Sequence, residues 1–251
     1  MMKWMFLLFV SATIFQIAPA QNIMDRFSYY DGQWKTAPMK KGAFMQRVRK
    51  LNDTTYLQTT YNTPGPRISQ VRSKDDAGKT LHGLCIYYHP NGFLDSAGEY
   101  KSGVMNGSWY SYDNEGNPFR RKDYDNGRFI KDTLFTFPSQ DSLKRVVPDS
   151  GEVESTFKGG IQGWTNFLTA NFIYPLQAQK SNMEGMVVLQ FKIDEKGRVR
   201  EPEINRSVDY TLDEEALRII NRSPAWIPAS KDGKVVVSYK RQPVIFRLTG
   251  K

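Results

Sequence analysis

The chain contains very little cysteine and histidine, and this scarcity excludes several kinds of site. It has one cysteine, Cys85, and two histidines, His82 and His89, in 251 residues. A single thiol cannot form an internal disulfide, and the strand-like surroundings of Cys85 predict a buried, inert side chain. Structural zinc sites show four ligands at set intervals, and no such spacing occurs here. We therefore predict no metal site and no cofactor.

Patterns of catalytic and nucleic-acid-binding proteins are also missing. No nucleophile stands with a base and an orienting group, and there is no phosphate-binding loop, so we predict that the protein is not an enzyme. The 35 Lys and Arg against 26 Asp and Glu give a net charge of +9, but no basic run exceeds three residues. Nucleic-acid-binding proteins cluster their basic residues. The sequence therefore predicts no nucleic-acid partner, and binding to protein becomes the function to look for.

One long apolar run is present, and it stands at the N-terminus. Lys3 precedes an almost unbroken apolar stretch from Trp4 to Ile17, and Ala18-Pro19-Ala20 follows with small residues where a signal peptidase reads. This pattern predicts a secretory signal peptide over residues 1–20. The alternative is a retained signal anchor, because residues 4–20 reach the lower limit for crossing a bilayer. Membrane association would then occur only through this uncleaved N-terminus.

The middle of the chain repeats with a period of 24 residues. The aligned residues are all glycine or tyrosine: Gly83 with Gly107, Tyr88 with Tyr112, Gly92 with Gly116, Tyr100 with Tyr124, and Gly103 with Gly127. Asn-Gly turn signals separate short strands in which aromatic residues alternate. We predict an all-β repeat domain over residues 21–136, clearest in 83–130, that forms a meander or solenoid-like sheet. The alternating aromatic residues either pack the sheet or form an exposed ladder that binds a partner.

The segments GLCIYYHPNG, GEYKSGVMNGSWYSYDNEG and DYDNG resemble MORN-like repeats of the YwqK antitoxin type. This resemblance concerns fold and implies little about function. Residues 137–156 follow, without periodicity and rich in Pro, Ser, Asp and Glu. They predict a linker between two domains that fold separately and move independently.

Residues 157–251 predict a small α+β domain with a three-stranded antiparallel sheet and two main helices. A helix runs from Gly163 to Tyr174, where Pro175 ends it, and a short helix follows. Strands from Met186 to Ile204 form a hairpin. Thr211 and Glu214 form a capping box before the next helix. With the repeat domain, the predicted fold class is α+β.

The final strand predicts an exposed sheet edge. Val235, Val237 and Tyr239 share one face, whereas the later apolar residues have the opposite parity, so we predict a β-bulge near residues 241–242. Pro243 cannot donate a ladder hydrogen bond and is confined to edges or bulges. Such an edge can pair with an extended peptide by strand addition.

This C-terminal segment resembles the C-terminal domain of TonB-family energy transducers, in the form found in Bacteroidetes-type bacteria. The matching motifs are Tyr174-Pro175, EG-x-V from Glu184, F-x-I-D-x-x-G-x-V from Phe191, Glu215-Ala216-Leu217, W-x-P-A from Trp226, the closing P-V-x-F, and Gly159-Gly160. The resemblance implies a periplasmic or envelope domain that grips the TonB box of outer-membrane receptors during transport. It places peptide binding at Tyr174, Pro175, Val235, Val236, Val237, Ser238, Tyr239, Lys240 and Arg241.

The chain departs from TonB in its N-terminal part. The apolar N-terminus lacks the Ser-x-x-x-His pattern that couples TonB to the ExbB–ExbD motor, because Phe15 stands four residues after Ser11. There is also no long Pro-Lys/Glu spacer. A second hypothesis therefore stays open: a structural or interaction protein of the envelope that acts through its β-repeat sheet and is not coupled to the motor.

Overall fold

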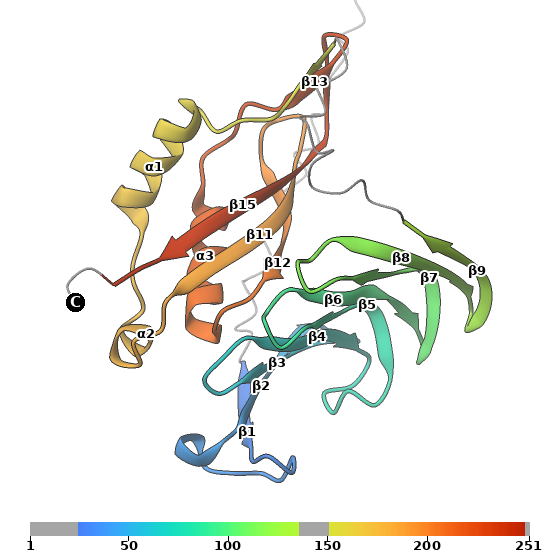
Figure 1. Ribbon diagram of the computed structural model, residues 1–251. Coiled ribbons are helices and arrows are strands. Elements are labelled where there is room, and N and C mark those ends of the chain that lie inside the picture. The colour runs from blue at the N-terminus through green and yellow to red at the C-terminus, as the bar shows by residue number, and fades with distance from the viewer. Residues whose placement is uncertain (1–24, 136–150, 249–251) are drawn as a thin grey trace, which may run out of the picture.

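The computed structural model describes residues 25–135 and 151–248 (Figure 1). We call 25–135 the repeat module and 151–248 the C-terminal module. The predicted signal peptide, residues 1–20, and residues 136–150 of the predicted linker lie outside the described residues. No helix in the described ranges is long and apolar enough to span a membrane.

The repeat module is one antiparallel sheet of nine strands, in which each strand pairs with its neighbours in sequence. The strands are β1 (Arg26–Tyr30), β2 (Phe44–Asn52), β3 (Thr55–Asn62), β4 (Arg67–Ser73), β5 (Leu81–Tyr88), β6 (Leu94–Lys101), β7 (Val104–Tyr112), β8 (Pro118–Asp125) and β9 (Arg128–Leu134). A single 3₁₀ turn, η1 (Met39–Lys41), separates β1 from β2. Figure 1 shows this sheet curving strongly from β1 to β9.

The turns that the repeat pattern predicted are present. The β6–β7 and β8–β9 connections each place two central residues at positive φ, Ser102 with Gly103 and Asn126 with Gly127. Such turns match the twist of the flanking strands. Trp109 is buried, contacts Tyr100 edge-to-face at 5.2 Å, and donates its indole N–H to the Glu99 carbonyl. This aromatic residue therefore packs the sheet.

The C-terminal module contains two sheets and three helices. Its elements follow one another along the chain as β10 (Glu152–Val153), α1 (Gly160–Asn171), α2 (Leu176–Lys180), β11 (Gly185–Ile193), β12 (Val199–Arg206), α3 (Tyr210–Arg222), β13 (Ala229–Lys231), β14 (Lys234–Val236) and β15 (Ser238–Phe246). The main sheet has the order β12-β11-β15, and a small one has the order β10-β13-β14. The predicted α+β class, with a large first sheet and a smaller second domain built on three strands, is confirmed.

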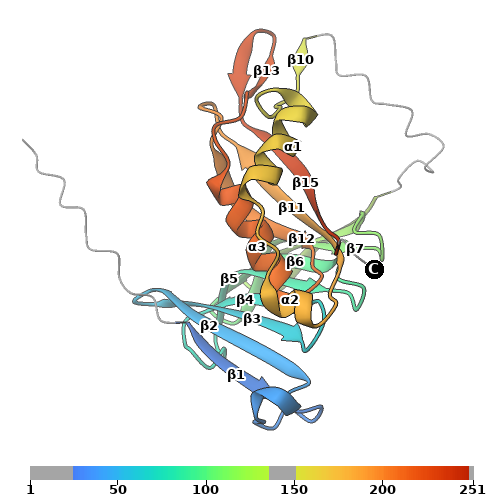
Figure 2. The same ribbon diagram turned by 90° about the vertical axis from the view of Figure 1, so that its left-hand side faces the viewer.

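Alternation of side chains along β11 explains why this sheet carries helices on one face. Val187, Leu189, Phe191 and Ile193 are all buried, whereas the residues between them are partly exposed. They pack with the apolar stripe of α3 and with Trp164 of α1. Figure 2 shows α1 and α3 over the same face of the β11–β15 pair.

Three local predictions for this module are wrong. Helix α1 ends at Asn171 instead of Tyr174, because the Glu215 carboxylate takes the Ile173 N–H and Phe172 packs on Phe246. Helix α3 is capped by Asp209, whose carboxylate accepts hydrogen bonds from the N–H and hydroxyl of Thr211, so the predicted capping box does not form.

The third concerns the final strand, which has no bulge near residues 241–242. Its pairing with β11 runs without a register shift from Gly185 opposite Phe246 to Ile193 opposite Ser238. The chain instead changes sheet at Val237, which lies between β14 and β15. Val235 and Tyr239 thus belong to different sheets, and this division accounts for the change of parity.

The two modules do not stand apart, contrary to the independent motion expected from a linker. Ile86, Tyr88 and Leu94 of the repeat module belong to the same hydrophobic core as the C-terminal module. The Tyr88 hydroxyl donates to the Ile204 carbonyl at 2.9 Å. The last residues of the predicted linker are also structured, because β10 pairs with β13.

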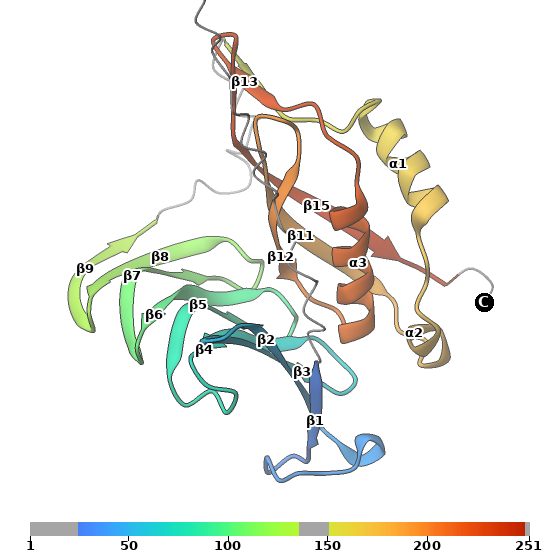
Figure 3. The same cartoon turned by 180° about the vertical axis from the view of Figure 1, so that it is seen from behind.

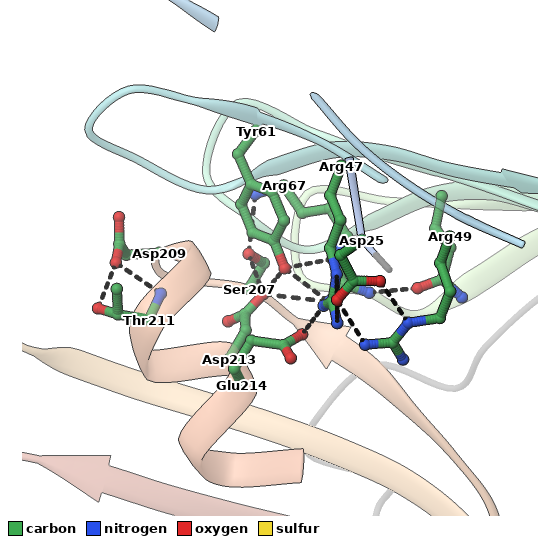
Figure 4. Close-up of polar contacts among 11 residues, drawn as sticks. Asp25, Arg47, Arg49, Tyr61, Arg67, Ser207, Asp209, Thr211, Asp213 and Glu214 are labelled. Carbon is green, nitrogen blue, oxygen red and sulfur yellow. Dashed lines mark hydrogen bonds and ion pairs between the residues drawn. The ribbon is translucent and has the colours of Figure 1, made fainter. Parts of the chain in front are cut away.

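A buried polar network completes this module interface (Figure 4). The Asp213 carboxylate of α3 accepts hydrogen bonds from the hydroxyls of Tyr61 and Ser207, and the guanidinium of Arg67 lies 3.6 Å away. At the rim, Arg47 forms a 2.8 Å ion pair with Glu214. Burial raises the pKa of Asp213 to about 6, although Arg67 and the donors favour its charged form.

Candidate functional site

The outer edge of β15 is the feature that the sequence predicted as a binding element. In the part of the chain that the structure describes, β15 pairs with β11 on one side and with no strand on the other. It is nine residues long and antiparallel to β11 throughout. Figure 1 shows β15 at the margin of its sheet, on the side away from β12. An edge strand of this kind presents a row of unpaired backbone groups.

Pro243 indicates which backbone groups of β15 point outward. In an antiparallel ladder, successive residues alternate between bonding the partner strand and facing away from it. Proline has no N–H, so it is tolerated where that group would face away. Because the register with β11 has no shift, Tyr239, Arg241 and Ile245 share the parity of Pro243. Their N–H and C=O groups are therefore the ones directed away from β11.

The side chains of this parity lie on the sheet face opposite the helices. Tyr239 is 70% exposed and Ile245 is 54% exposed. The Lys192 ammonium of β11 lies 5.7 Å from the centre of the Tyr239 ring. Arg241 is exposed and makes a long 3.4 Å contact with the Gln190 side chain, and its charge also acts on the hydroxyl of Tyr112 in β7. The edge thus presents aromatic, basic and aliphatic side chains in turn.

A hollow of about 270 Å³ opens beside the start of β15, lined by Glu152–Ser155, Ala229, Ser230 and Val236–Lys240. We call it the β15 hollow. The Lys240 ammonium donates to the Ser155 carbonyl at 2.7 Å, and the hydroxyls of Ser155 and Ser238 are 2.8 Å apart. These contacts hold the segment after β10 against the beginning of β15. Among the described residues, no segment from outside the main sheet forms hydrogen bonds of this kind with β15 beyond Lys240.

Tyr174 and Pro175 lie at the opposite end of β15 from the hollow. Tyr174 packs edge-to-face on Phe246 at 5.8 Å, and its hydroxyl donates to the Met183 carbonyl. Partial burial, reinforced by the nearby Glu184 carboxylate, raises the pKa of this hydroxyl. Pro175 precedes α2 as its N-cap residue. Tyr174 therefore packs against the end of β15 from the helix side.

The predicted site residues therefore follow one strand and its two ends instead of forming one patch. Val235 and Val236 lie in β14, and Val237 lies at the change of sheet. Ser238, Tyr239, Lys240 and Arg241 occupy the first half of β15. The sequence prediction missed Ile245 and the segment Glu152–Ser155. The parity of Pro243 would have indicated Ile245, whereas no sequence signal connects residues 152–155 with β15.

Other polar groups offer no comparable site. The cluster around Asp213 is buried within the module interface. Its side chains line none of the hollows found among the described residues. Cys85 is buried as a free thiol. Among residues 25–135 and 151–248, no three His, Cys, Asp or Glu side chains gather where they could hold a metal ion.

Comparison with known proteins gives one match. Residues 170–248 match the family described as Gram-negative bacterial TonB protein C-terminal. The matched range begins within α1 and includes the whole β12-β11-β15 sheet with α2 and α3. No curated protein and no solved structure matches the chain.

Proposed function

We propose that the protein is a periplasmic or envelope TonB-like protein that binds extended peptides by strand addition to the outer edge of β15. The observation that carries the proposal is the unpaired edge of β15, which lies inside the segment that matches the TonB C-terminal family. That family is one of energy transduction and protein interaction, not of catalysis. The peptide class is the TonB box of outer-membrane receptors.

Strand addition uses the backbone for affinity and the side chains for selectivity. The outward N–H and C=O groups at Tyr239, Arg241 and Ile245 supply the main-chain bonds. The β15 hollow lies where a side chain near one end of the added peptide would enter. Each main-chain hydrogen bond contributes only about 0.5–1.5 kcal/mol net, so several must form together.

Coupling to the proton-motive motor is not part of this proposal. The N-terminal segment lacks the Ser-x-x-x-His pattern, since Ser11 is followed four residues later by Phe15. Receptor binding and powered transport are therefore separate questions for this chain.

A second candidate is binding through the repeat sheet, and one observation favours it. Strand β9 is an edge strand of the nine-stranded sheet, and it exposes Phe129, Ile130 and Leu134 at 53%, 50% and 69%. An edge with exposed apolar side chains is a place where another chain can pair. In this alternative the C-terminal module is an accessory.

The edge mechanism is tested by a matched pair of substitutions at Arg241. Arg241→Ala removes the side chain and keeps the backbone, whereas Arg241→Pro also removes an outward N–H without touching the ladder to β11. Binding of receptor TonB-box peptides to the full chain should weaken less than threefold in the first variant and at least tenfold in the second. Circular dichroism checks that both remain folded.

If both Arg241 variants are folded and bind the TonB-box peptides with equal affinity, strand addition to β15 is contradicted. Binding through β9 would then be the favoured mechanism. Substitution of Phe129 and Ile130 by serine would in that case abolish binding of envelope proteins to the chain.

A further inference from the structure

A second hollow, of about 510 Å³, lies where the two modules meet, below α2 and beside β1. Its lining comes from both modules: Phe27, Tyr29, Met39, Lys40, Met45, Thr63, Gln177, Asp209, Tyr210 and Thr211. We call it the α2 hollow. Figure 3 shows β1 and the turn after it facing α2 across this region. Its volume falls within the range of about 300–1,000 Å³ that is typical of small-molecule sites.

The walls of the α2 hollow are mainly apolar and partly uncovered. Phe27 is 41% exposed and Met39 is 56% exposed, although both are large apolar side chains. Tyr210 stands between them and the interface, with its ring 5.8 Å from Phe27 and 5.5 Å from Tyr61. Aromatic rings and flexible methionines together fit a slender apolar body better than a polar one.

The polar groups of the hollow determine the charge of the ligand. Asp209 is already engaged, because its carboxylate caps α3 through Thr211. Lys40 makes no side-chain hydrogen bond or ion pair with any described residue. The hydroxyl of Thr63 is buried and has no hydrogen-bond partner within the described ranges. A free cation and an unsatisfied hydroxyl are complementary to an anionic head group.

We infer that the α2 hollow binds a free amphipathic carboxylate of the fatty-acid type, with its chain against Phe27, Met39 and Met45 and its head at Lys40. Because residues of both modules line the hollow, such a ligand contacts both sides of the module interface. This inference goes beyond the proposed peptide binding and does not depend on β15.

Two adjacent lysines give a matched test. Lys40 lines the hollow and Lys41 does not, and both are exposed residues of the same short turn. The probe is 11-(dansylamino)undecanoic acid, titrated by fluorescence into the exported protein, with its methyl ester as the uncharged counterpart. We expect saturable binding of the acid, a loss of about tenfold in Lys40→Glu, and a change below twofold in Lys41→Glu.

Met39→Glu tests the apolar wall, and it should fold because Met39 is mostly exposed. This substitution should weaken binding of both the acid and the ester, whereas Lys40→Glu should weaken binding of the acid alone. Absence of saturable binding, equal losses in the two lysine variants, or parent-like binding by folded Met39→Glu would overturn the inference.

Discussion

At the scale of single residues, Asp213 connects the module interface to pH. Its carboxylate is fully buried and accepts hydrogen bonds from the Tyr61 and Ser207 hydroxyls and from the Val208 N–H. Burial raises its pKa from 3.8 to about 6, so the folded protein holds the proton more tightly than the unfolded chain. This contribution to stability is complete below the unfolded pKa and is lost as pH rises through the folded pKa.

Comparison of the parent with Asp213→Asn therefore gives a pH-dependent difference in the free energy of unfolding. At about 1.4 kcal/mol per pKa unit, the parent should lose about 2 kcal/mol relative to the variant between about pH 4.5 and pH 7. Urea denaturation at the two pH values measures this change. A difference that grows in favour of the parent as pH rises would mean that the ion pair with Arg67 outweighs burial.

Gly92 shows how closely the modules approach each other. It has φ of 86°, and its carbonyl accepts the Ser207 N–H at 2.9 Å. A Cβ at Gly92 would overlap the Ser207 carbonyl. Gly103 has a similar φ of 90° but has no atom near its Cβ position. An added side chain would meet backbone strain at both glycines, but steric overlap only at Gly92. Comparing the two positions therefore separates the cost of strain from the cost of crowding at the interface.

We expect Gly103→Ala to cost about 1–2 kcal/mol, which is the cost of a left-handed conformation in an L-residue. Gly92→Ala should cost roughly 1–3 kcal/mol more, since the added methyl must displace the β12–α3 connection. Urea midpoints with unchanged slopes measure both losses. Equal losses of unfolding free energy in the two variants would show that the β12–α3 connection can move to accept the methyl group at no cost.

At the scale of elements, long periodic segments were predictable and short ones were not. The alternation along β11 and the apolar stripe of α3 each identify an element and its buried face. The three-residue strands β13 and β14 carry no usable period, and this is why the change of sheet at Val237 looked like a bulge within one strand. The cap of α3 was misplaced because Asp209 and Thr211 are both good capping residues.

One part of the candidate site was likewise predictable from the sequence, and another part was not. The strand that carries the edge, and its proline, were predictable because proline restricts the backbone by itself. The β15 hollow was not, because its other wall is Glu152–Ser155, more than 80 residues earlier in the chain. Only the fold brings that segment to β15.

At the scale of the whole molecule, the arrangement of the two modules was not predictable. Tyr61 and Arg67 lie in or beside short strands like many polar residues of the repeat module, and nothing local indicates that they meet Ser207 and Asp213. A linker-like composition favoured independence, whereas the structure places residues of both modules in one core.

This shared core predicts the behaviour of a cleaved chain. After a protease site inserted between residues 136 and 150 is cut, the two fragments should elute together in size-exclusion chromatography without denaturant. Urea near the unfolding midpoint should separate them, because the apolar contacts of Ile86, Tyr88 and Leu94 are then lost. Fragments that elute separately in native buffer would show that the interface is weaker than its burial implies.

Peptide addition to β15 through its outward backbone groups can be observed by residue-resolved amide hydrogen exchange, with and without a bound TonB-box peptide. We expect the N–H groups of Tyr239, Arg241 and Ile245 to exchange fast in the free protein and slowly in the complex. Those of Lys240 and Gln242 should be slow in both states. Unchanged exchange along β15, with new protection on β9, would contradict strand addition to β15.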